Sequence, residues 1–193
     1  MVAVGAGAGA GMSGPQEIEV KYRVFDLDDL ERELAARGVI LSEPVHQDDQ
    51  AFAQGGWSYG QSKVGVPFAR LRTQAGRHLF TVKRPVANEM ACIEHESEVT
   101  DREEMRRAVE LMGFYPTVRI VKTRRTARLG ELLLCLDEVE HAGSFLEIEK
   151  VLGQGEDGEL VQAELDEFAR SLGARLERTT ETYDSIVRAA LLQ

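Results

Sequence analysis

Hydrophobic and polar residues alternate along much of this chain, which is the pattern of strands with one buried face. In the first such segment, Ile18, Val20 and Tyr22 alternate with charged residues. Glycine-containing turn signals, such as Ala75-Gly76, separate the alternating segments. The pattern predicts eight strands, at 16–25, 46–53, 66–73, 78–84, 92–99, 116–126, 131–138 and 144–151.

Hydrophobic residues spaced three and four apart predict helices between and after these strands. Asp26 is expected to cap the first helix and Thr100 the second, because short polar side chains accept hydrogen bonds from the first helical amides. The four predicted helices are 27–37, 101–112, 158–172 and 180–192.

Eight mostly antiparallel strands with a few helices fit either a sandwich or a closed barrel. Charged residues occupy the alternate positions of many strands, and a hydrophobic core cannot accept them. We therefore expect an α+β fold, a closed eight-stranded antiparallel β-barrel (a tunnel) with flanking helices and a polar interior. Residues 15–193 are predicted to be one domain, 1–14 a flexible Gly/Ala-rich tail, and 54–65 an exposed, mobile loop.

Composition narrows the class of function. Of 193 residues, 33 are Asp or Glu and 23 are Lys or Arg, and a net charge of −10 argues against general nucleic-acid binding. No apolar run is long enough to span a membrane, and the N-terminus lacks the features of a signal peptide. Cys92 and Cys135 form no Cys-x-x-Cys motif, so a reducing, cytoplasmic compartment is the simplest expectation.

Carboxylates and cations recur on the alternate positions of several strands. Any one such stripe could be the solvated face of a half-buried strand. Neutral polar residues are few, however, and the stripes combine hard oxygen ligands for Mg²⁺ or Mn²⁺ with groups that neutralise phosphate. A polyphosphate bound with a divalent cation needs both. A Walker-type phosphate loop is absent from the sequence, so side chains are expected to hold the phosphates.

Several of these segments resemble the motifs of the CYTH superfamily, the triphosphate tunnel metalloenzymes. The resemblance begins with an ExExK motif at Glu17, Glu19 and Lys21. Further matching segments follow in order: DDQAF (48–52), LRT (71–73), TVKRP (81–85), ESEV (96–99), LDEV (136–139), FLEIE (145–149) and TYDSIV (182–187).

The resemblance implies a tunnel that binds a nucleoside triphosphate or polyphosphate lengthwise, with Mg²⁺ or Mn²⁺ as cofactor. By position, the metal ligands would be Glu17, Glu19, Glu147 and Glu149, with Asp137 a metal or supporting group. The phosphate-binding residues would be Lys21, Arg70, Arg72, Lys83, Lys122 and Arg124, of which Lys21, Arg70, Lys83 and Lys122 would be catalytic. Glu96 and Glu98 would order the cations or hold a second metal. The family usually has an Arg before the central ExE. This chain has none there, so that contact is expected either to be missing or to be supplied by Arg119 or Arg125.

The segments look most like the class IV adenylyl cyclase branch, a lyase that would convert ATP to cyclic AMP and pyrophosphate. The alternative is a triphosphatase that hydrolyses inorganic, nucleoside or thiamine triphosphate. A non-catalytic module that binds polyphosphate or RNA ends ranks last. A homodimer is expected only by analogy with the cyclase branch. Trp57 and Tyr59 could close over a ligand or simply pack.

Overall fold

The computed structural model describes residues 16–192, and its sheet is a closed antiparallel barrel, as predicted. The predicted tail at 1–14 lies outside the described residues. The strands are β1 (Gln16–Val24), β2 (Val45–Gln54), β3 (Phe68–Gln74), β4 (Arg77–Pro85), β5 (Ala91–Val99), β6 (Phe114–Leu129), β7 (Leu132–Val139), β8 (Gly143–Val151) and β9 (Leu176–Thr179).

Pairing between β1 and β5 closes the barrel. The strand order is β5-β4-β3-β2-β6-β7-β8-β1, and Glu17 of β1 lies opposite Cys92 of β5. A ninth strand, β9, extends the sheet from β1 through the pairs Lys21–Thr179 to Val24–Leu176. It was missed because four residues are too short for a period of two to stand out.

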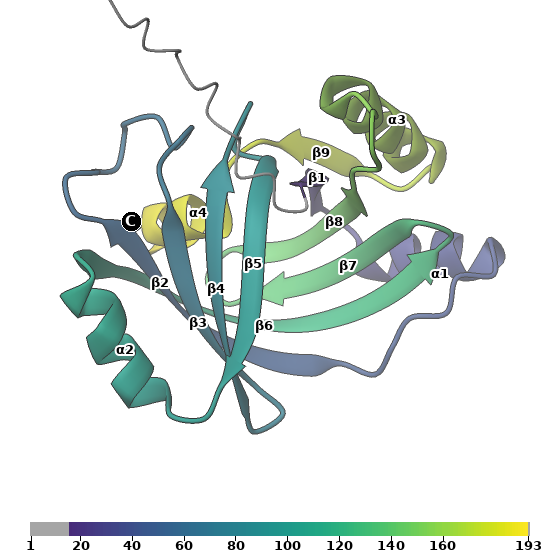
Figure 1. Cartoon of the computed structure of the whole chain (residues 1–193). Helices are drawn as coiled ribbons and strands as arrows, with labels where there is room; N and C mark the ends of the chain where they lie inside the picture. The colour runs from purple at the N-terminus through teal and green to yellow at the C-terminus, as the bar shows by residue number, and fades with distance from the viewer. Residues whose placement is uncertain (1–15, 193) are drawn as a thin grey trace, which may run out of the picture.

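The helices of residues 16–192 are α1 (Leu27–Ala36), α2 (Arg102–Leu111), α3 (Gly158–Ser171) and α4 (Tyr183–Leu191). Figure 1 shows α1 and α3 on one side of the barrel and α2 on the other. Asp26 caps α1 as predicted, with its Oδ1 2.9 Å from the amide of Asp29. The prediction for Thr100 is wrong, since Asp101 caps α2 by accepting from two amides. Thr100 and Asp101 are both residue types that commonly cap helices, so the pattern alone did not distinguish them.

Most of the hydrophobic core lies between the outside of the barrel and α1, α2 and α3, whereas α4 packs against inward-facing residues such as Ile120 and Phe145. On β1, Ile18, Val20, Tyr22 and Val24 face outward and pack in one cluster with side chains of α1 and α3. Complete burial of a leucine such as Leu30 of α1 stabilises the fold by about 1.5–3 kcal/mol. Because strand side chains alternate, a core on the outside directs the charged residues of the same strands into the barrel.

The loop between β2 and β3 is more buried than the sequence predicts. Trp57 is only 6% exposed, donates from Nε1 to the carbonyl of Ser62 at 3.2 Å, and packs edge-on against Phe68. Lys63 is also buried. The prediction of an exposed loop is therefore wrong at these two positions, and Trp57 has the packing role. In residues 16–192, the helices are all too short or too polar to cross a membrane.

Candidate functional site

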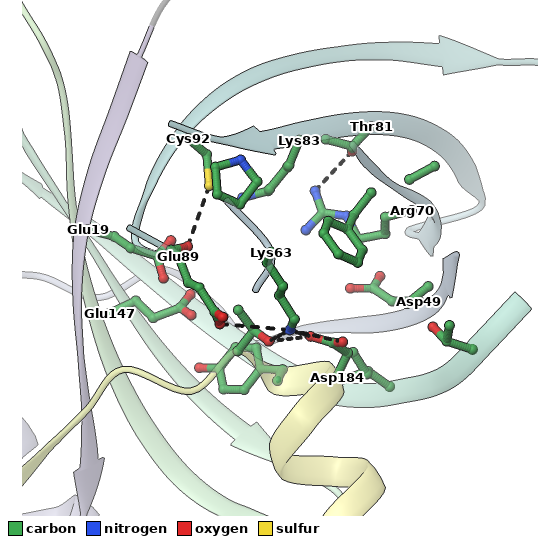
Figure 2. A pocket seen from close by; sticks show the side chains of 18 of the residues that line it. Glu19, Asp49, Lys63, Arg70, Thr81, Lys83, Glu89, Cys92, Glu147 and Asp184 are labelled. Carbon is green, nitrogen blue, oxygen red and sulfur yellow. Dashed lines mark hydrogen bonds and ion pairs between the residues drawn. The ribbon is translucent and has the colours of Figure 1, made fainter. Parts of the chain in front are cut away.

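The barrel encloses a cavity of about 180 Å³ whose lining is dominated by charged side chains. Figure 2 shows Glu19, Arg70, Lys83 and Glu147 entering it from different strands, together with Asp49. The predicted site residues that line it are Glu19, Lys21, Arg70, Lys83, Lys122, Arg124, Glu147 and Glu149. The fold thus brings together residues that are up to 130 positions apart in the chain.

Strand register places an acid opposite a base on the inner face at several points. Lys21 lies opposite Glu147, and Arg124 lies opposite Asp137. Elsewhere Lys83 faces Glu94 across β4 and β5. Opposite charges at directly facing positions stabilise strand pairing, whereas like charges destabilise it. The barrel therefore tolerates a charged interior because its register neutralises most of it.

Asp137, which is fully buried, is the centre of the largest ionic cluster. Its carboxylate accepts from Lys122 Nζ at 3.0 Å, from Arg124 Nε at 2.6 Å and from the Tyr183 hydroxyl at 2.8 Å. The guanidinium of Arg124 also donates to Glu147. Although burial opposes ionisation, Lys122 and Arg124 hold the pKa of Asp137 below its usual range. The cluster fixes two cations at the cavity wall.

Lys21 is also buried at the cavity wall, with 2% of its surface exposed. Its Nζ lies 3.1 Å from Glu147, 3.5 Å from Glu19 and 4.3 Å from the centre of the Tyr183 ring. Burial alone would lower the pKa of Lys21, but the two carboxylates outweigh it and raise the pKa above the usual value. Lys21 is therefore charged when it meets a ligand.

Arg70 of β3 and Lys83 of β4 contribute two further cations to the cavity lining. Lys83 Nζ is 2.5 Å from Glu94, and Arg70 donates to the Thr81 hydroxyl at 3.0 Å and to Glu96 at 3.2 Å. The Nε of Arg70 is buried and has no hydrogen-bond acceptor among the described residues. A buried N–H without an acceptor is costly, so this group is suited to an anionic ligand.

Arg72 is held differently from the other predicted phosphate ligands. Its guanidinium makes two bonds to Asp49, at 2.8 Å and 2.7 Å. Burial disfavours the Asp49 anion, but Arg72 lowers its pKa to about 2. Arg72 is absent from the cavity lining, whereas Asp49 belongs to it. Asp49 lies in the DDQAF segment of β2, directly opposite Arg72 of β3. Since facing residues of paired strands point to the same side of the sheet, its inward position could have been inferred.

Glu17 and Glu19 of β1 lie near Glu149 at the end of β8. Glu19 and Glu149 face each other across β1 and β8. Burial, with repulsion from Glu94, raises the pKa of Glu17 to about 7, and burial with repulsion from Glu147 and Glu19 raises that of Glu149 to about 7. Across residues 16–192, three or more His, Cys, Asp or Glu side chains nowhere converge on one metal position. The oxygen donors nevertheless fit a hard divalent cation, which would favour the ionised form of Glu17 and Glu149.

Several predicted residues are absent from the cavity lining, among them Glu17, Glu96, Glu98, Arg119 and Arg125. Glu98 is exposed and pairs with Arg77, and Glu96 bonds to Arg70. Arg119, whose side chain is 64% exposed, pairs with Asp48, and Arg125 pairs with Glu31 of α1. The expectation that Arg119 or Arg125 replaces the missing arginine is wrong, because both project from the outward parity of β6.

Sequence reasoning missed several residues that close one end of the cavity. Lys63, Glu89, Thr182, Tyr183 and Asp184 all belong to its lining. Tyr183 lies within the TYDSIV segment, which gave a motif signal without a role. Lys63 gave no signal, since a single lysine in a Gly/Ser-rich loop looks like a surface residue.

Cys92 is the cysteine that lines the cavity. Burial raises the pKa of its thiol to about 11, so the thiol is protonated at neutral pH. A protonated thiol is a poor nucleophile. The arrangement therefore suits electrostatic binding of an anion and direct transfer at phosphorus, without a covalent cysteine intermediate.

Comparison with known proteins identifies the same architecture elsewhere. The model of the CYTH domain matches residues 15–183. A protein of Methanocaldococcus jannaschii named "putative adenylate cyclase" is 25% identical over 179 residues, which cover 92% of this chain and 97% of the relative. The structure of the PH1012 protein from Pyrococcus horikoshii OT3 matches with a TM-score of 0.73 and 26% identity, covering 89% of this chain and 99% of that one.

A more distant structure carries a reported activity. It is a "putative adenylyl cyclase" from Hippeastrum, described as having a dominant triphosphatase activity. Its TM-score is 0.59 at 20% identity, covering 90% of this chain and 95% of that one, so the likeness is one of fold.

Proposed function

Since the chain belongs to the CYTH domain family, we propose that it is a metal-dependent enzyme that converts ATP, bound in its barrel, to cyclic AMP and pyrophosphate. The observation that carries the proposal is the set of cations that line the cavity, of which Lys21 and Lys122 are buried, with carboxylates beside them. A buried cation is costly unless it is paired, and a triphosphate offers enough charge to pair with several at once. The relative named as an adenylate cyclase supports the choice of reaction.

In this proposal the phosphates are bound by Lys21, Arg70, Lys83, Lys122 and Arg124. Asp137 and Glu147 already accept bonds from Lys122, Arg124 and Lys21, so we assign these two carboxylates to orienting the cations rather than to the metal. Arg72 would act through Asp49, and Glu96 through Arg70. Glu98, which pairs with Arg77 in solvent, has no role.

Glu17, Glu19 and Glu149 would hold Mg²⁺ or Mn²⁺. When bound, the metal would neutralise the phosphates and polarise the phosphorus–oxygen bonds. The chain's own cations would hold the triphosphate in line and stabilise charge on the leaving pyrophosphate. The 3′-hydroxyl would lose its proton to water and its oxygen would bond to the α-phosphorus. The bond from that phosphorus to the oxygen that bridges to the β-phosphorus would break, and pyrophosphate would leave with that oxygen.

Hydrolysis of a triphosphate is the second candidate. The Hippeastrum protein, named as a cyclase but described with a dominant triphosphatase activity, supports it. Water would attack the terminal phosphorus, and the same cations would stabilise the same kind of charge. A non-catalytic binding module remains last, since it has no need of the carboxylates on β1 and β8.

One incubation separates these reactions. Purified protein is mixed with ATP, tripolyphosphate or thiamine triphosphate and with Mg²⁺ or Mn²⁺, and cyclic AMP, pyrophosphate and orthophosphate are resolved. Cyclic AMP and pyrophosphate in equal amounts would support the cyclase. Pyrophosphate or orthophosphate without cyclic AMP would refute it and support hydrolysis. Binding without turnover would support the last candidate.

Two matched variants test the metal assignment. Glu19→Gln removes a carboxylate of the cavity, and we expect a loss of activity of at least about 100-fold, since metal-assisted charge stabilisation supplies several kcal/mol. Glu98→Gln makes the same chemical change on β5, where Glu98 pairs with Arg77 outside the cavity, and should leave activity unchanged. Equal activity of Glu19→Gln and the parent protein would overturn the assignment.

A further inference from the structure

The first residue of α4 lies beside two buried cations of the barrel cavity. This residue is Tyr183, which is buried and lines the cavity. The centre of its ring is 4.3 Å from Lys21 Nζ and 4.6 Å from Lys122 Nζ. A single aromatic ring therefore contacts two of the lysines that would bind phosphate.

An aromatic ring holds a cation without cancelling its charge. The face of the ring is electron-rich and attracts an ammonium group that lies within about 6 Å of its centre. A carboxylate attracts the same group more strongly, but it also competes with an anionic ligand for the charge. Lys122 already lies 3.0 Å from Asp137, and Lys21 lies 3.1 Å from Glu147. The ring adds a further restraint on both ammonium groups and leaves their charge available to phosphate.

Tyr183 is itself held in place by its hydroxyl and by its ring. The hydroxyl donates to the Asp137 carboxylate at 2.8 Å, and the ring meets the Phe145 ring edge to face at a centroid distance of 5.2 Å. Asp137 also accepts from Lys122, so the tyrosine and this lysine are bonded to the same carboxylate. Because the ring is fixed, it can fix the ammonium groups in turn.

The neighbours of Tyr183 in the chain fasten the start of α4 to the β2–β3 loop. Thr182 is the N-cap of α4, but its side chain makes no bond to a helix amide. Its hydroxyl instead accepts from Lys63 Nζ, which also lies 2.9 Å from Asp184 and 3.1 Å from the Ser185 hydroxyl. Figure 2 shows Lys63 beside Asp184. Three residues of the TYDSIV segment thus hold Lys63, and the tyrosine among them meets the cavity cations.

We propose that Tyr183 is a positioning residue for triphosphate binding, whose ring directs the ammonium groups of Lys21 and Lys122 toward the phosphates. This inference rests on the proposed function and gives the TYDSIV segment a role. The role belongs to the face of the ring, and the hydroxyl only helps to fix it. Nucleoside triphosphates and inorganic tripolyphosphate would depend on the ring alike, because both place phosphates in the barrel.

The test measures phosphate binding without turnover. The probe is an analogue of tripolyphosphate with methylene groups in place of its bridging oxygens, and its dissociation constant is measured by calorimetry with Mg²⁺ present. Tyr183→Leu removes the ring, whereas Tyr183→Phe removes only the hydroxyl. A trifluorinated phenylalanine at position 183 keeps the shape of Tyr183→Phe but removes electron density from the ring face. Tyr115→Leu is the matched control, since Tyr115 donates to the carbonyl of Trp57 and does not line the cavity.

We expect Tyr183→Leu to bind the analogue about 10-fold more weakly, because two cation–π contacts at a buried site are lost. The trifluorinated variant should lose at least about 5-fold, because its ring no longer attracts the ammonium groups. Tyr183→Phe and Tyr115→Leu should bind within about 3-fold of the parent protein, since the first keeps the ring face and the second leaves the cavity unchanged. Urea unfolding of each variant shows whether it is folded.

Parental affinity in Tyr183→Leu would overturn the inference and leave the proposed function intact. Equal weakening of Tyr183→Phe and the trifluorinated variant would also overturn it, because the electron density of the ring would then not matter. If Tyr183→Leu does not fold, this second comparison decides alone, since its two variants have the same shape. Failure of the parent protein to bind the analogue would overturn the proposed function itself.

Discussion

Replacing Asp137 by asparagine should destabilise the protein more than any other single change of charge in the barrel. Asp137 is fully buried and accepts bonds from Lys122, Arg124 and Tyr183. The Asp137→Asn variant would keep the shape of the side chain but lose its negative charge. Lys122 would then lack the only carboxylate within 4 Å among the described residues, and Arg124 would depend on Glu147 and Glu149.

The magnitude follows from leaving a buried cation without its partner. Removing one member of a buried ion pair typically costs about 3–5 kcal/mol, because the remaining charge is neither solvated nor neutralised. Two features of this site moderate the loss: Glu147 still accepts from Arg124, and an amide oxygen can still accept hydrogen bonds. We therefore expect a cost near the lower end, about 3 kcal/mol, which corresponds to a fall in Tm of about 6–12 °C for a chain of this size.

The assay is urea unfolding followed by circular dichroism, with thermal melting as a second measurement. Asp48→Asn is the matched control. Asp48 makes two bonds to Arg119, each at 2.8 Å, but the Arg119 side chain is 64% exposed. An exposed pair of this kind is worth about 1 kcal/mol or less. The reasoning is refuted if Asp137→Asn and Asp48→Asn lower the free energy of unfolding by the same amount.

Three further predictions concern the cavity carboxylates, the core and a helix cap. In metal-free protein, the free energy of unfolding should fall as pH rises from about 4.5 to about 7, because Glu149 keeps its proton in the folded chain up to about pH 7 and releases it near 4.5 when unfolded. Glu149→Gln should reduce this fall, and identical pH profiles from urea titrations would contradict the cause given. Leu30→Ala should cost about 2–5 kcal/mol by leaving a cavity under α1, whereas a cost below about 1 kcal/mol in the same titration would show that the site collapses. Asp101→Ala should cost about 1 kcal/mol through loss of the α2 cap, and Thr100→Ala should cost less, since Thr100 does not cap; the reverse order would refute the assignment.

The period-two alternation of the strands was sufficient to predict the barrel. Ile18, Val20 and Tyr22 required one covered face, and Glu17, Glu19 and Lys21 required the other face to be polar. Since a sandwich core cannot hold such charges, closure followed from the residues themselves. The short strand β9 was not predicted because four residues show no clear period, and the α2 cap was misassigned because Thr100 and Asp101 are both residue types that cap helices.

The order of acidic and basic residues along the chain determined by itself that the interior would be charged and suited to a polyphosphate with a metal. Only the tertiary structure decided which charges neutralise each other. Strand register sets Arg124 against Asp137 and Arg72 against Asp49, and it leaves Glu17 and Glu149 as carboxyls whose pKa is raised to about 7. Register is a long-range property, because it depends on pairing between strands distant in sequence. For the same reason Lys63, which meets Asp184 across 121 positions, gave no sign in the sequence that it stands at the boundary of the cavity.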